Sequence, residues 1–279
     1  MFRCKHLAAL LLMCLCIHAH AQRLIVGTFN LRYDNAGDSG NLWKDRAPVV
    51  TSLIAFHGFD ILGTQEGLKN QLDDISNALP EYDRYGVGRD DGKDAGEHSA
   101  IFYRKDKFAL LDKGDFWLSA TPDKPTLGWD ARCCKRICSW VKLKDKQTSK
   151  TVWVFNAHYD HEGKIAREES SKLVLQKIQA LAGKDMTVFM GDLNGGHDSE
   201  PYKIIATSGM LKDTYGMVAH PYTNNPSFQA FGKQLAGDNI IDHIFVSQQF
   251  RAIRWGILSD SYRGKYPSDH FPVLAEIAY

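Results

Sequence analysis

A short apolar segment at residues 186–190 leads directly to Gly191 and Asp192. A strand that is apolar on both faces belongs inside a sheet that other elements cover on both sides. The clearest helical pattern precedes this segment at residues 165–181, where Leu173 and Ile178 share one face. A buried strand after an amphipathic helix favours a layered α/β fold, because each layer needs another to cover its apolar face.

The rest of the chain repeats this mixture of strands and helices. Alternating or β-branched patterns predict strands at residues 24–32, 60–63, 99–104, 137–143, 151–158, 239–247 and 271–278. Shorter helices are expected just after Pro48, which would lie in a first turn, and around Leu72, Ile75 and Leu79. No repeat or linker-like stretch divides residues 22–279. The sequence therefore predicts one α/β domain, a sandwich of central sheets flanked by helices.

The first 21 residues have the pattern of a signal peptide. A positively charged start precedes an apolar run at residues 7–17, and a small-x-small cleavage site ends at Ala21. The apolar run is too short to cross a bilayer, and no later segment is long enough. Met13 before Cys14 is a poor lipid-attachment site, so a lipid anchor is the weaker interpretation. We expect cleavage after Ala21 and export to the periplasm or the medium.

Charge restricts the partners that such a protein would hold. The whole chain has 34 Lys and Arg against 33 Asp and Glu, a formal net charge of +1, and removal of residues 1–21 takes away two of the positive charges. Affinity for long nucleic acids comes largely from basic side chains that neutralise phosphates. A nearly neutral chain therefore argues against a nuclease that grips duplex DNA. It favours a small or single-stranded phosphate ester as substrate, and we expect a monomer.

Three cysteines remain beyond the expected signal peptide. Cys133, Cys134 and Cys138 lie within one short stretch, without a nearby fourth ligand that would complete a zinc cage. In an exported protein, a local disulfide from Cys133 or Cys134 to Cys138 is the more plausible use of these residues. Free thiols remain the alternative.

Polar side chains gather where the expected strands end. Asn30 and Glu66 follow the first two strands, His158 ends a later one, and Asp192 and Asn194 follow the buried apolar segment. A rigid sheet can hold side chains from distant positions in one cleft. A carboxylate that leaves a core needs a partner, and Mg²⁺ takes one or two carboxylates together with water and substrate phosphate. These positions indicate a magnesium site.

The remaining candidates lie before or within strands. Asp242 is surrounded by aliphatic residues and needs a charged or hydrogen-bonding partner, for which a histidine is the obvious candidate. Asp269 and His270 precede the last strand, and Glu97 precedes the strand at residues 99–104. Each residue alone has a structural explanation, such as a cap, a turn or a satisfied core histidine. Together they predict a catalytic cleft.

These residues lie in motifs that resemble those of the endonuclease/exonuclease/phosphatase superfamily, the metal-dependent phosphoesterases related to DNase I. The resemblance extends from about Leu24 to Tyr279 and implies a four-layer sandwich of two mixed sheets with the motifs in one cleft. It rests on short segments in the order of the family: Thr28-Phe29-Asn30-Leu31-Arg32, Gln65-Glu66, Glu97-His98-Ser99-Ala100-Ile101-Phe102-Tyr103, Asn156-Ala157-His158, Gly191-Asp192-Leu193-Asn194, Ile241-Asp242-His243-Ile244-Phe245 and Ser268-Asp269-His270-Phe271-Pro272-Val273.

The resemblance implies roles for the residues that would surround the metal. Glu66 resembles the principal metal carboxylate, with Asn30 beside it and Asp269 as the second acid near the ion. Asp192 resembles the group that orients or deprotonates the attacking water, and Asn194 resembles a donor to the phosphate. The implied cofactor is Mg²⁺, with Mn²⁺ as a substitute.

Two histidines complete the implied site. His270 resembles a phosphate-contacting histidine that Asp242 holds, and His158 resembles the histidine on the side of the leaving group, with Glu97 as its carboxylate partner. Some family members have tyrosine in place of His158, so the chemistry at the leaving group differs from theirs.

Several other side chains have more than one interpretation. Arg136 leads into a strand and is the candidate for a substrate contact, but we expect a surface salt bridge first and the substrate contact second. Trp43 and Arg46 resemble a pair common in the family, and we expect packing at a helix start first and a substrate contact second. Asp160 and His161 are expected in a polar loop rather than as further ligands.

Together these observations predict a Mg²⁺-dependent hydrolase of phosphate esters, in which an activated water attacks phosphorus in line. A phosphodiesterase or exonuclease-like activity is one form of this prediction. A phosphomonoesterase acting on a sugar, inositol or nucleotide phosphate is the alternative. A binding protein on an inactive scaffold would have lost some of the metal and histidine motifs, and all of them are present.

Overall fold

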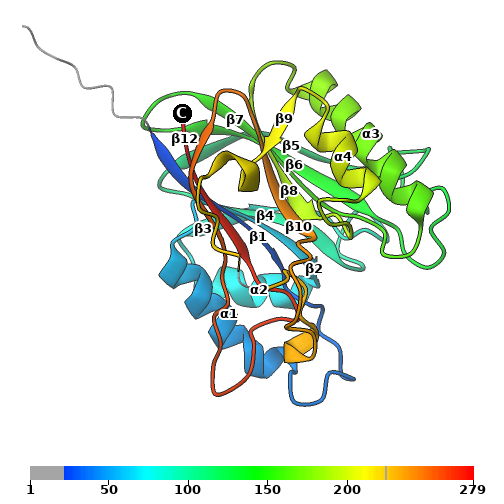
Figure 1. The fold of residues 1–279 in the computed structure, drawn as a ribbon, viewed down its shortest axis with the longest axis vertical. Helices are drawn as coiled ribbons and strands as arrows, with labels where there is room; N and C mark the ends of the chain where they lie inside the picture. Colours follow the sequence, from blue (N-terminus) through cyan, green and yellow to red (C-terminus); the bar gives the residue numbers. More distant parts are fainter. Residues whose placement is uncertain (1–21, 224) are drawn as a thin grey trace, which may run out of the picture.

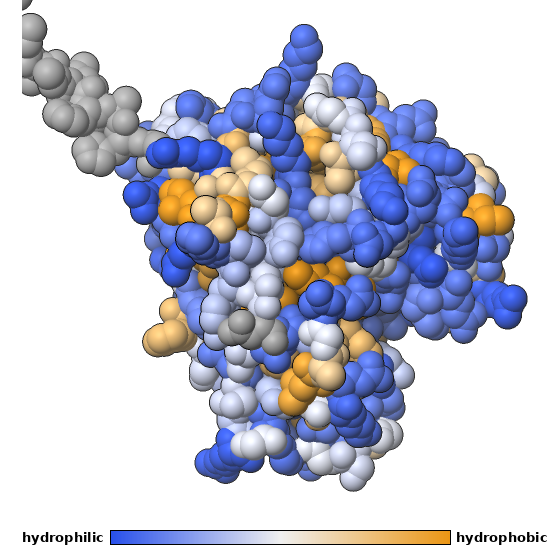
Figure 2. All heavy atoms as spheres, in the orientation of Figure 1, coloured by the Kyte–Doolittle hydropathy of each residue, from blue (hydrophilic) through white to orange (hydrophobic). Residues whose placement is uncertain are grey.

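The computed structural model describes residues 22–223 and 225–279, so the expected signal peptide lies outside the described residues. Within this part of the chain, two six-stranded sheets pack face to face and helices cover their outer faces (Figure 1). This arrangement confirms the four-layer α/β sandwich expected from the sequence. Figure 2 shows a mostly hydrophilic face with apolar side chains in small separate groups. None of the described helices has the length and apolar character needed to span a bilayer.

The first sheet contains the first and the last strand of the sandwich. Its strands follow the order β11 (Arg251–Ile257), β12 (Val273–Ala278), β1 (Arg23–Asn30), β2 (Ile61–Gly67), β4 (His98–Arg104) and β3 (Tyr82–Tyr85). Its outer face is covered by α1 (Trp43–His57) and α2 (Lys69–Ala78), which lie below the sheet in Figure 1.

The second sheet is built from the middle of the chain. Its strands follow the order β5 (Phe108–Trp117), β6 (Ile137–Asp145), β7 (Thr151–His158), β8 (Met186–Asp192), β10 (Asp242–Ser247) and β9 (Leu211–Asp213). Its outer face is covered by α3 (Lys164–Leu181) and α4 (Glu200–Ala206). Two short 3₁₀ helices, η1 (Tyr215–Met217) and η2 (Ala230–Gly232), lie in the connections.

Three apolar cores separate the four layers. The central core lies between the sheets and includes Val26 from the first and Val154 from the second. The outer cores pack each sheet against its helices, with Val50 of α1 in one and Val174 of α3 in the other. Because both faces of the central strands are buried, these strands are apolar along much of their length, as the segment at residues 186–190 indicated.

Each sheet has one parallel pair at its centre, and these pairs position the site. β1 and β2 are joined through α1, and β7 and β8 through α3, whereas the other neighbouring strands are antiparallel. Parallel strands end at the same edge of their sheet, so Asn30 lies beside Gln65 and His158 beside Asp192. The antiparallel strand β10 places Asp242 next to Asp192. The polar ends of distant strands therefore meet along one rim.

Some elements differ from the prediction. β3, β5, β9, β11 and α4 were not expected, and the strand predicted at residues 239–247 begins only at Asp242. Helix α1 begins at Trp43, so Pro48 lies inside the helix rather than in its first turn. The helix starts early because Trp43 and Arg46 both turn into the core, where they are 3% and 0% exposed.

Arg46 ties helix α1 to two loops that border the site. Its guanidinium donates hydrogen bonds to the backbone oxygens of Asn41, Leu31, Arg32 and Pro267, at 2.7–3.0 Å. Five N–H donors on one planar group suit such a convergence of carbonyls. Arg46 therefore packs at the start of a helix, as expected from the sequence. Arg46 thus holds together the loop after β1 and the loop before β12.

Replacing Arg46 with Met keeps an aliphatic side chain but removes every donor. A buried acceptor without a partner costs about 1–3 kcal/mol, so the free energy of unfolding should fall by at least about 3 kcal/mol. Urea unfolding followed by tryptophan fluorescence measures this change. Arg254→Met is the matched control, because Arg254 lies on the surface beside Glu276 and should change stability by less than about 1 kcal/mol. Equal losses in both variants would contradict this role.

Candidate active site

A cavity of about 530 Å³ opens where the ends of the central strands meet. The structure brings all ten candidate residues to this place. Eight of them line the cavity: Glu66, Glu97, Arg136, His158, Asp192, Asn194, Asp269 and His270. The other two, Asn30 and Asp242, are fully buried and contact residues of the lining from behind.

Glu66 enters the cavity from an irregularity in strand β2. The pairing of β2 with β4 shifts register between Thr64 and Gly67, and Glu66 has a φ of 62°, which is uncommon for a residue with a side chain. Such bulges redirect a side chain next to active sites. Asn30 donates hydrogen bonds from its amide nitrogen to Glu66 Oε1 at 3.1 Å and to Asp192 Oδ2 at 3.0 Å. One amide thus joins a carboxylate from each sheet.

His270 is held between two buried carboxylates. Its Nδ1 lies 2.9 Å from Asp242 Oδ2, and its Nε2 lies 3.7 Å from Asp192 Oδ2. Burial lowers the pKa of His270, but the nearby charge and hydrogen bond of Asp242 outweigh it and raise the pKa to about 10. Phe228 packs edge-on against the ring, with 5.0 Å between ring centroids. The arrangement keeps a positively charged donor at the cavity wall.

Asp192 and Asn194 form a tight turn at the end of β8. The backbone N–H of Asn194 donates to Asp192 Oδ1 at 2.9 Å, and Asn194 has a φ of 45°. The Asn194 amide nitrogen donates to Tyr159 O at 3.0 Å and lies 3.2 Å from His158 Nε2. Burial and the charge of Asp242 raise the pKa of Asp192 to about 7. An aspartate with its pKa near neutrality is suited to accept a proton from water.

The acidic residues fit a hard divalent cation. Glu66 and Asp269 both lie near Arg32, with N–O distances of 4.0 and 3.9 Å. Arg32 makes its close ion pair with Asp38 instead, at 2.8 Å. Burial and the charge of Glu66 raise the pKa of Asp269. Negative charge in this corner, including that of Asp192, exceeds the positive charge around it. Carboxylate and amide oxygens are the donors that Mg²⁺ and Mn²⁺ prefer.

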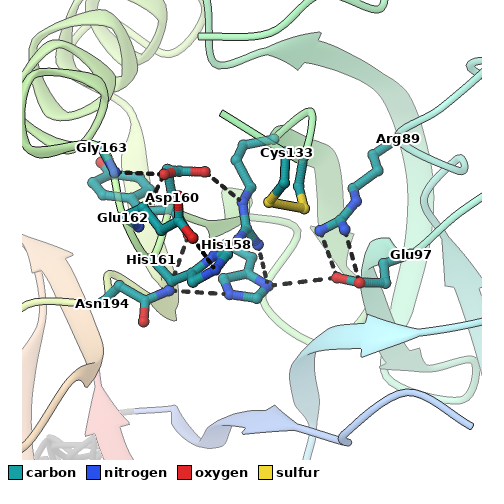
Figure 3. The surroundings of a disulfide bond; sticks show 12 residues. Arg89, Glu97, Cys133, His158, Asp160, His161, Glu162, Gly163 and Asn194 are labelled. Atoms are coloured by element: carbon teal, nitrogen blue, oxygen red, sulfur yellow. Dashed lines mark hydrogen bonds and ion pairs between the residues drawn. A yellow bond between two sulfur atoms is a disulfide. The ribbon is translucent and has the colours of Figure 1, made fainter. Parts of the chain in front are cut away.

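His158 has a different partner from the one expected. Glu97 Oε2 lies 3.9 Å from His158 Nδ1, too far for a hydrogen bond, and the Glu97 carboxylate instead accepts two hydrogen bonds from Arg89 at 2.5 and 2.8 Å (Figure 3). Arg136 Nη1 lies 3.1 Å from the same Nδ1. An arginine can only donate, so Nδ1 accepts and the ring proton is on Nε2, which faces Asp192. Glu97 is therefore a longer contact of His158 than expected, and the hydrogen-bond distance to Nδ1 belongs to Arg136.

Arg136 positions two histidines rather than lying on the surface. Its side chain is 5% exposed, and it also reaches His161 Nδ1 at 2.7 Å and Asp160 Oδ2 at 3.4 Å. Burial, followed by the charges of Arg136 and Arg89, holds the pKa of His158 well below its usual value. His158 is thus a neutral imidazole with a proton available on Nε2. A surface salt bridge is the wrong interpretation of Arg136, and His161 belongs to the cavity wall.

The disulfide also differs from the expectation. Cys133 and Cys134 are bonded to each other, and Cys138 is buried and forms no disulfide with either of them. Cys138 lies on strand β6 with its side chain in the core under the helices, whereas the adjacent pair lies in the loop before this strand. The bonded pair lines the cavity near Arg89 and His158 (Figure 3).

Several cavity residues were not among the predicted site residues: Arg32, Tyr33, Arg89, Cys133, Cys134, His161, Phe228 and Ile241. Arg32 lies inside one of the family motifs, so its positive charge beside the predicted acidic residues could have marked it as a site residue. Arg89 lies in the glycine-rich loop between β3 and β4, where no periodic pattern marks a side chain that points inward.

Substitution of Asp242 by Asn tests how His270 is held. The change is nearly isosteric, but it removes the charge that keeps His270 protonated. The kcat for hydrolysis of p-nitrophenyl phosphate should fall by about 10²–10⁴-fold, while thermal unfolding shows a folded protein. Asp60→Asn is the matched control, since Asp60 is 3% exposed and contacts Lys107 and the N–H of Ile25 at the opposite end of the strands. An active D242N would contradict this role.

Known proteins share this architecture. The family model for the endonuclease/exonuclease/phosphatase family matches residues 27–270. A solved protein of this family from Bacteroides thetaiotaomicron is 46% identical, with a TM-score of 0.90 over 93% of this chain and 99% of the other. A mannosyl-6-phosphatase from the same organism is also 46% identical, with a TM-score of 0.88 over 92% of this chain and 100% of the other.

A more distant likeness concerns the fold alone. The catalytic domain of human nocturnin is 19% identical, with a TM-score of 0.71 over 91% of this chain and 93% of the other. The family model and the two relatives from Bacteroides thetaiotaomicron each cover most of the chain. The chain therefore belongs to the endonuclease/exonuclease/phosphatase family of phosphoester hydrolases.

Proposed function

We propose that this protein is a Mg²⁺-dependent phosphomonoesterase that removes phosphate from a phosphorylated sugar. The observation that carries the proposal is the part of the cavity wall formed by Arg89, Glu97, Arg136, His161 and the Cys133–Cys134 disulfide, next to Glu66. The mannosyl-6-phosphatase that shares 46% of its residues supports the same substrate class. Because the first 21 residues have the pattern of a signal peptide, we also propose that the protein is exported.

The acidic corner of the cavity is where phosphate would bind. A divalent cation held by Glu66 and Asp269 would neutralise charge on the phosphate oxygens. His270 is a charged donor, and Asn194 is a neutral one on the opposite side of Asp192. Asp192 accepts a hydrogen bond from Asn30 on Oδ2 and from the Asn194 backbone on Oδ1, which fixes its carboxylate. Asp192 is therefore the residue that would orient the attacking water and take its proton.

His158 is the residue that would contact the leaving group. When water attacks phosphorus in line, the bond from phosphorus to the sugar oxygen breaks, and that oxygen needs a proton. His158 has its proton on Nε2, because Arg136 occupies Nδ1. Because its pKa is lowered, His158 stays a neutral ring that would donate a hydrogen bond from Nε2 to the departing sugar oxygen. The proton that this oxygen takes up would come from solvent water, while Asp192 takes the proton of the attacking water. Arg136 holds the ring in place during these transfers.

The part of the cavity wall that contains Arg89 and Glu97 favours a sugar over a nucleic acid as substrate. Ion pairs that are partly buried, such as Arg89–Glu97, offer both donors and acceptors to sugar hydroxyls. Single-stranded nucleic acids bind instead on stacked aromatic rings along a basic groove. Of the described residues around the cavity, Tyr33 and Phe228 are the phenyl-type side chains, and each is already engaged, with Arg32 and with His270. A volume of about 530 Å³ is within the range for a small-molecule pocket.

Metal removal tests the cation requirement. EDTA should abolish hydrolysis of p-nitrophenyl phosphate, and Mg²⁺ or Mn²⁺ alone should restore it, because the phosphate charge is otherwise uncompensated. Glu66→Gln should lose at least about 10²-fold in kcat at metal concentrations that saturate the wild type. Far-UV circular dichroism serves as the folding control. Full activity in the presence of EDTA would rule out the scheme.

A substrate panel tests the choice of a sugar monoester. Mannose 6-phosphate or another hexose phosphate should have a higher kcat/KM than dinucleotides, single-stranded DNA or bis-p-nitrophenyl phosphate. In Glu97→Gln, the KM for the sugar phosphate should rise by about tenfold, which corresponds to one lost polar contact of about 1.4 kcal/mol. The KM for p-nitrophenyl phosphate, which has no hydroxyls to contact the wall, should change less. Faster hydrolysis of a dinucleotide or DNA than of every sugar phosphate would refute the proposal.

A further inference from the structure

A second group of metal-type side chains lies behind the active site. His197 comes from the loop between β8 and α4, Asp213 ends β9, and His243 is the second residue of β10. Successive residues of a strand point to opposite faces. Asp242 faces His270 in the active site, so His243 points away from it, towards the layer that contains α4. The group is separate from the acidic corner that would bind Mg²⁺.

The distances within this group do not fit hydrogen bonds. His197 Nε2 lies 3.5 Å from Asp213 Oδ2, and His243 Nδ1 lies 3.6 Å from the same oxygen. Both nitrogens are buried and lack a hydrogen-bond partner among the described residues. Zinc bonds of about 2.0–2.2 Å in a tetrahedron place neighbouring ligand atoms roughly 3.4 Å apart. The two nitrogen-to-oxygen distances therefore match the spacing of ligands around one ion, and all three atoms lie within 4.8 Å of one another.

The hydrogen bonding of His243 gives an independent reason. Its Nε2 lies 2.9 Å from the backbone oxygen of Gly195. A carbonyl oxygen can only accept, so Nε2 donates its proton to Gly195, and Nδ1 is the ring nitrogen that can bind a metal ion. Nδ1 faces Asp213 at a site where His243 is 1% exposed. A metal-binding histidine characteristically donates its other N–H to a carbonyl or carboxylate. A metal ion between Nδ1 and Asp213 Oδ2 would contact both groups.

The surrounding residues hold the ligands in place. Tyr202 OH donates to Asp213 Oδ2 at 3.0 Å, and the backbone N–H of Tyr215 donates to Asp213 Oδ1 at 2.9 Å. The rings of Tyr215 and Tyr202 pack against His197, with centroid distances of 4.6 and 4.8 Å. Contacts of this kind fix ligand orientation before a metal binds.

We propose that His197, Asp213 and His243 form a site for Zn²⁺ or a similar late transition-metal ion. Two imidazoles and one carboxylate suit zinc, whereas Mg²⁺ prefers oxygen donors alone. The fourth position is left to a water molecule. The ion links the loop between β8 and α4, strand β9 and the strand that carries Asp242. It stabilises the fold behind the active site, and this inference does not depend on the proposed substrate.

Metal analysis of the whole protein tests the proposal. After chelation and removal of the chelator, calorimetric titration of the wild type with Zn²⁺ should show binding, and the Tm should rise, because an ion that binds only the folded state stabilises it. In Glu66→Gln this Zn²⁺ binding should persist. In His197→Asn the Kd should weaken by roughly 10²-fold or more, with loss of the Tm increase. His57→Asn is the matched control, since His57 lies far away beside Asp260.

The outcomes separate this site from the active site. Zn²⁺ binding that survives in Glu66→Gln and disappears in His197→Asn supports the proposal. Binding that is lost in Glu66→Gln but retained in His197→Asn assigns the ion to the acidic corner and overturns it, as does a wild-type protein that binds no Zn²⁺. His197 is partly exposed, so its substitution by Asn should leave the chain folded. Visible absorption of a Co²⁺-substituted wild type, altered in His197→Asn, reports nitrogen ligation directly.

Discussion

The amide of Asn30 connects the two sheets at the point where their carboxylates meet. It donates one hydrogen bond to Glu66 from the first sheet and one to Asp192 from the second. Buried carboxylates repel each other and resist ionisation, as the raised pKa of Asp192 indicates. A donor shared between them, together with a cation, allows both to remain charged in one small volume. The site thus exists only while the sheets keep their relative position.

A second buried amide fixes that position deeper in the sandwich. Asn156 of β7 donates to the backbone oxygens of Thr64 and Ala100 in the other sheet, at 2.8 and 2.9 Å, and accepts from Gln65 at 2.7 Å. These bonds cross an otherwise apolar interface, where an unpaired polar group is costly. A sliding of one sheet over the other would break all three. The same constraint that specifies the fold therefore aligns Asn30 with its two carboxylates.

The sequence predicted what depends on periodicity and strand ends. The central strands were recognised because both faces are apolar, and Glu66, His158 and Asp192 were found because they follow such strands. The edge strands β3, β5, β9 and β11 were missed, since half-exposed strands such as β5 have no clear alternation. The export signal and the monomeric state remain predictions.

Partners that come from loops could not be predicted from spacing. Arg89 binds the carboxylate of Glu97 and Arg136 contacts Nδ1 of His158, so Glu97 and His158 approach each other only to 3.9 Å. Cys133 bonds to its neighbour because Cys138 faces a helix-covered core. His197 and His243 are separated by strands and loops, and only the fold places both beside Asp213.

A crystal structure with Mg²⁺ and a phosphate-like anion such as vanadate or tungstate would test the central claim most directly. The account predicts one cation on Glu66, with the anion between it and Asp192 and with His270 Nε2 and the Asn194 amide within hydrogen-bond distance of its oxygens. An anion bound elsewhere, with Glu66, Asp192 and His270 contacting only one another, would contradict the account.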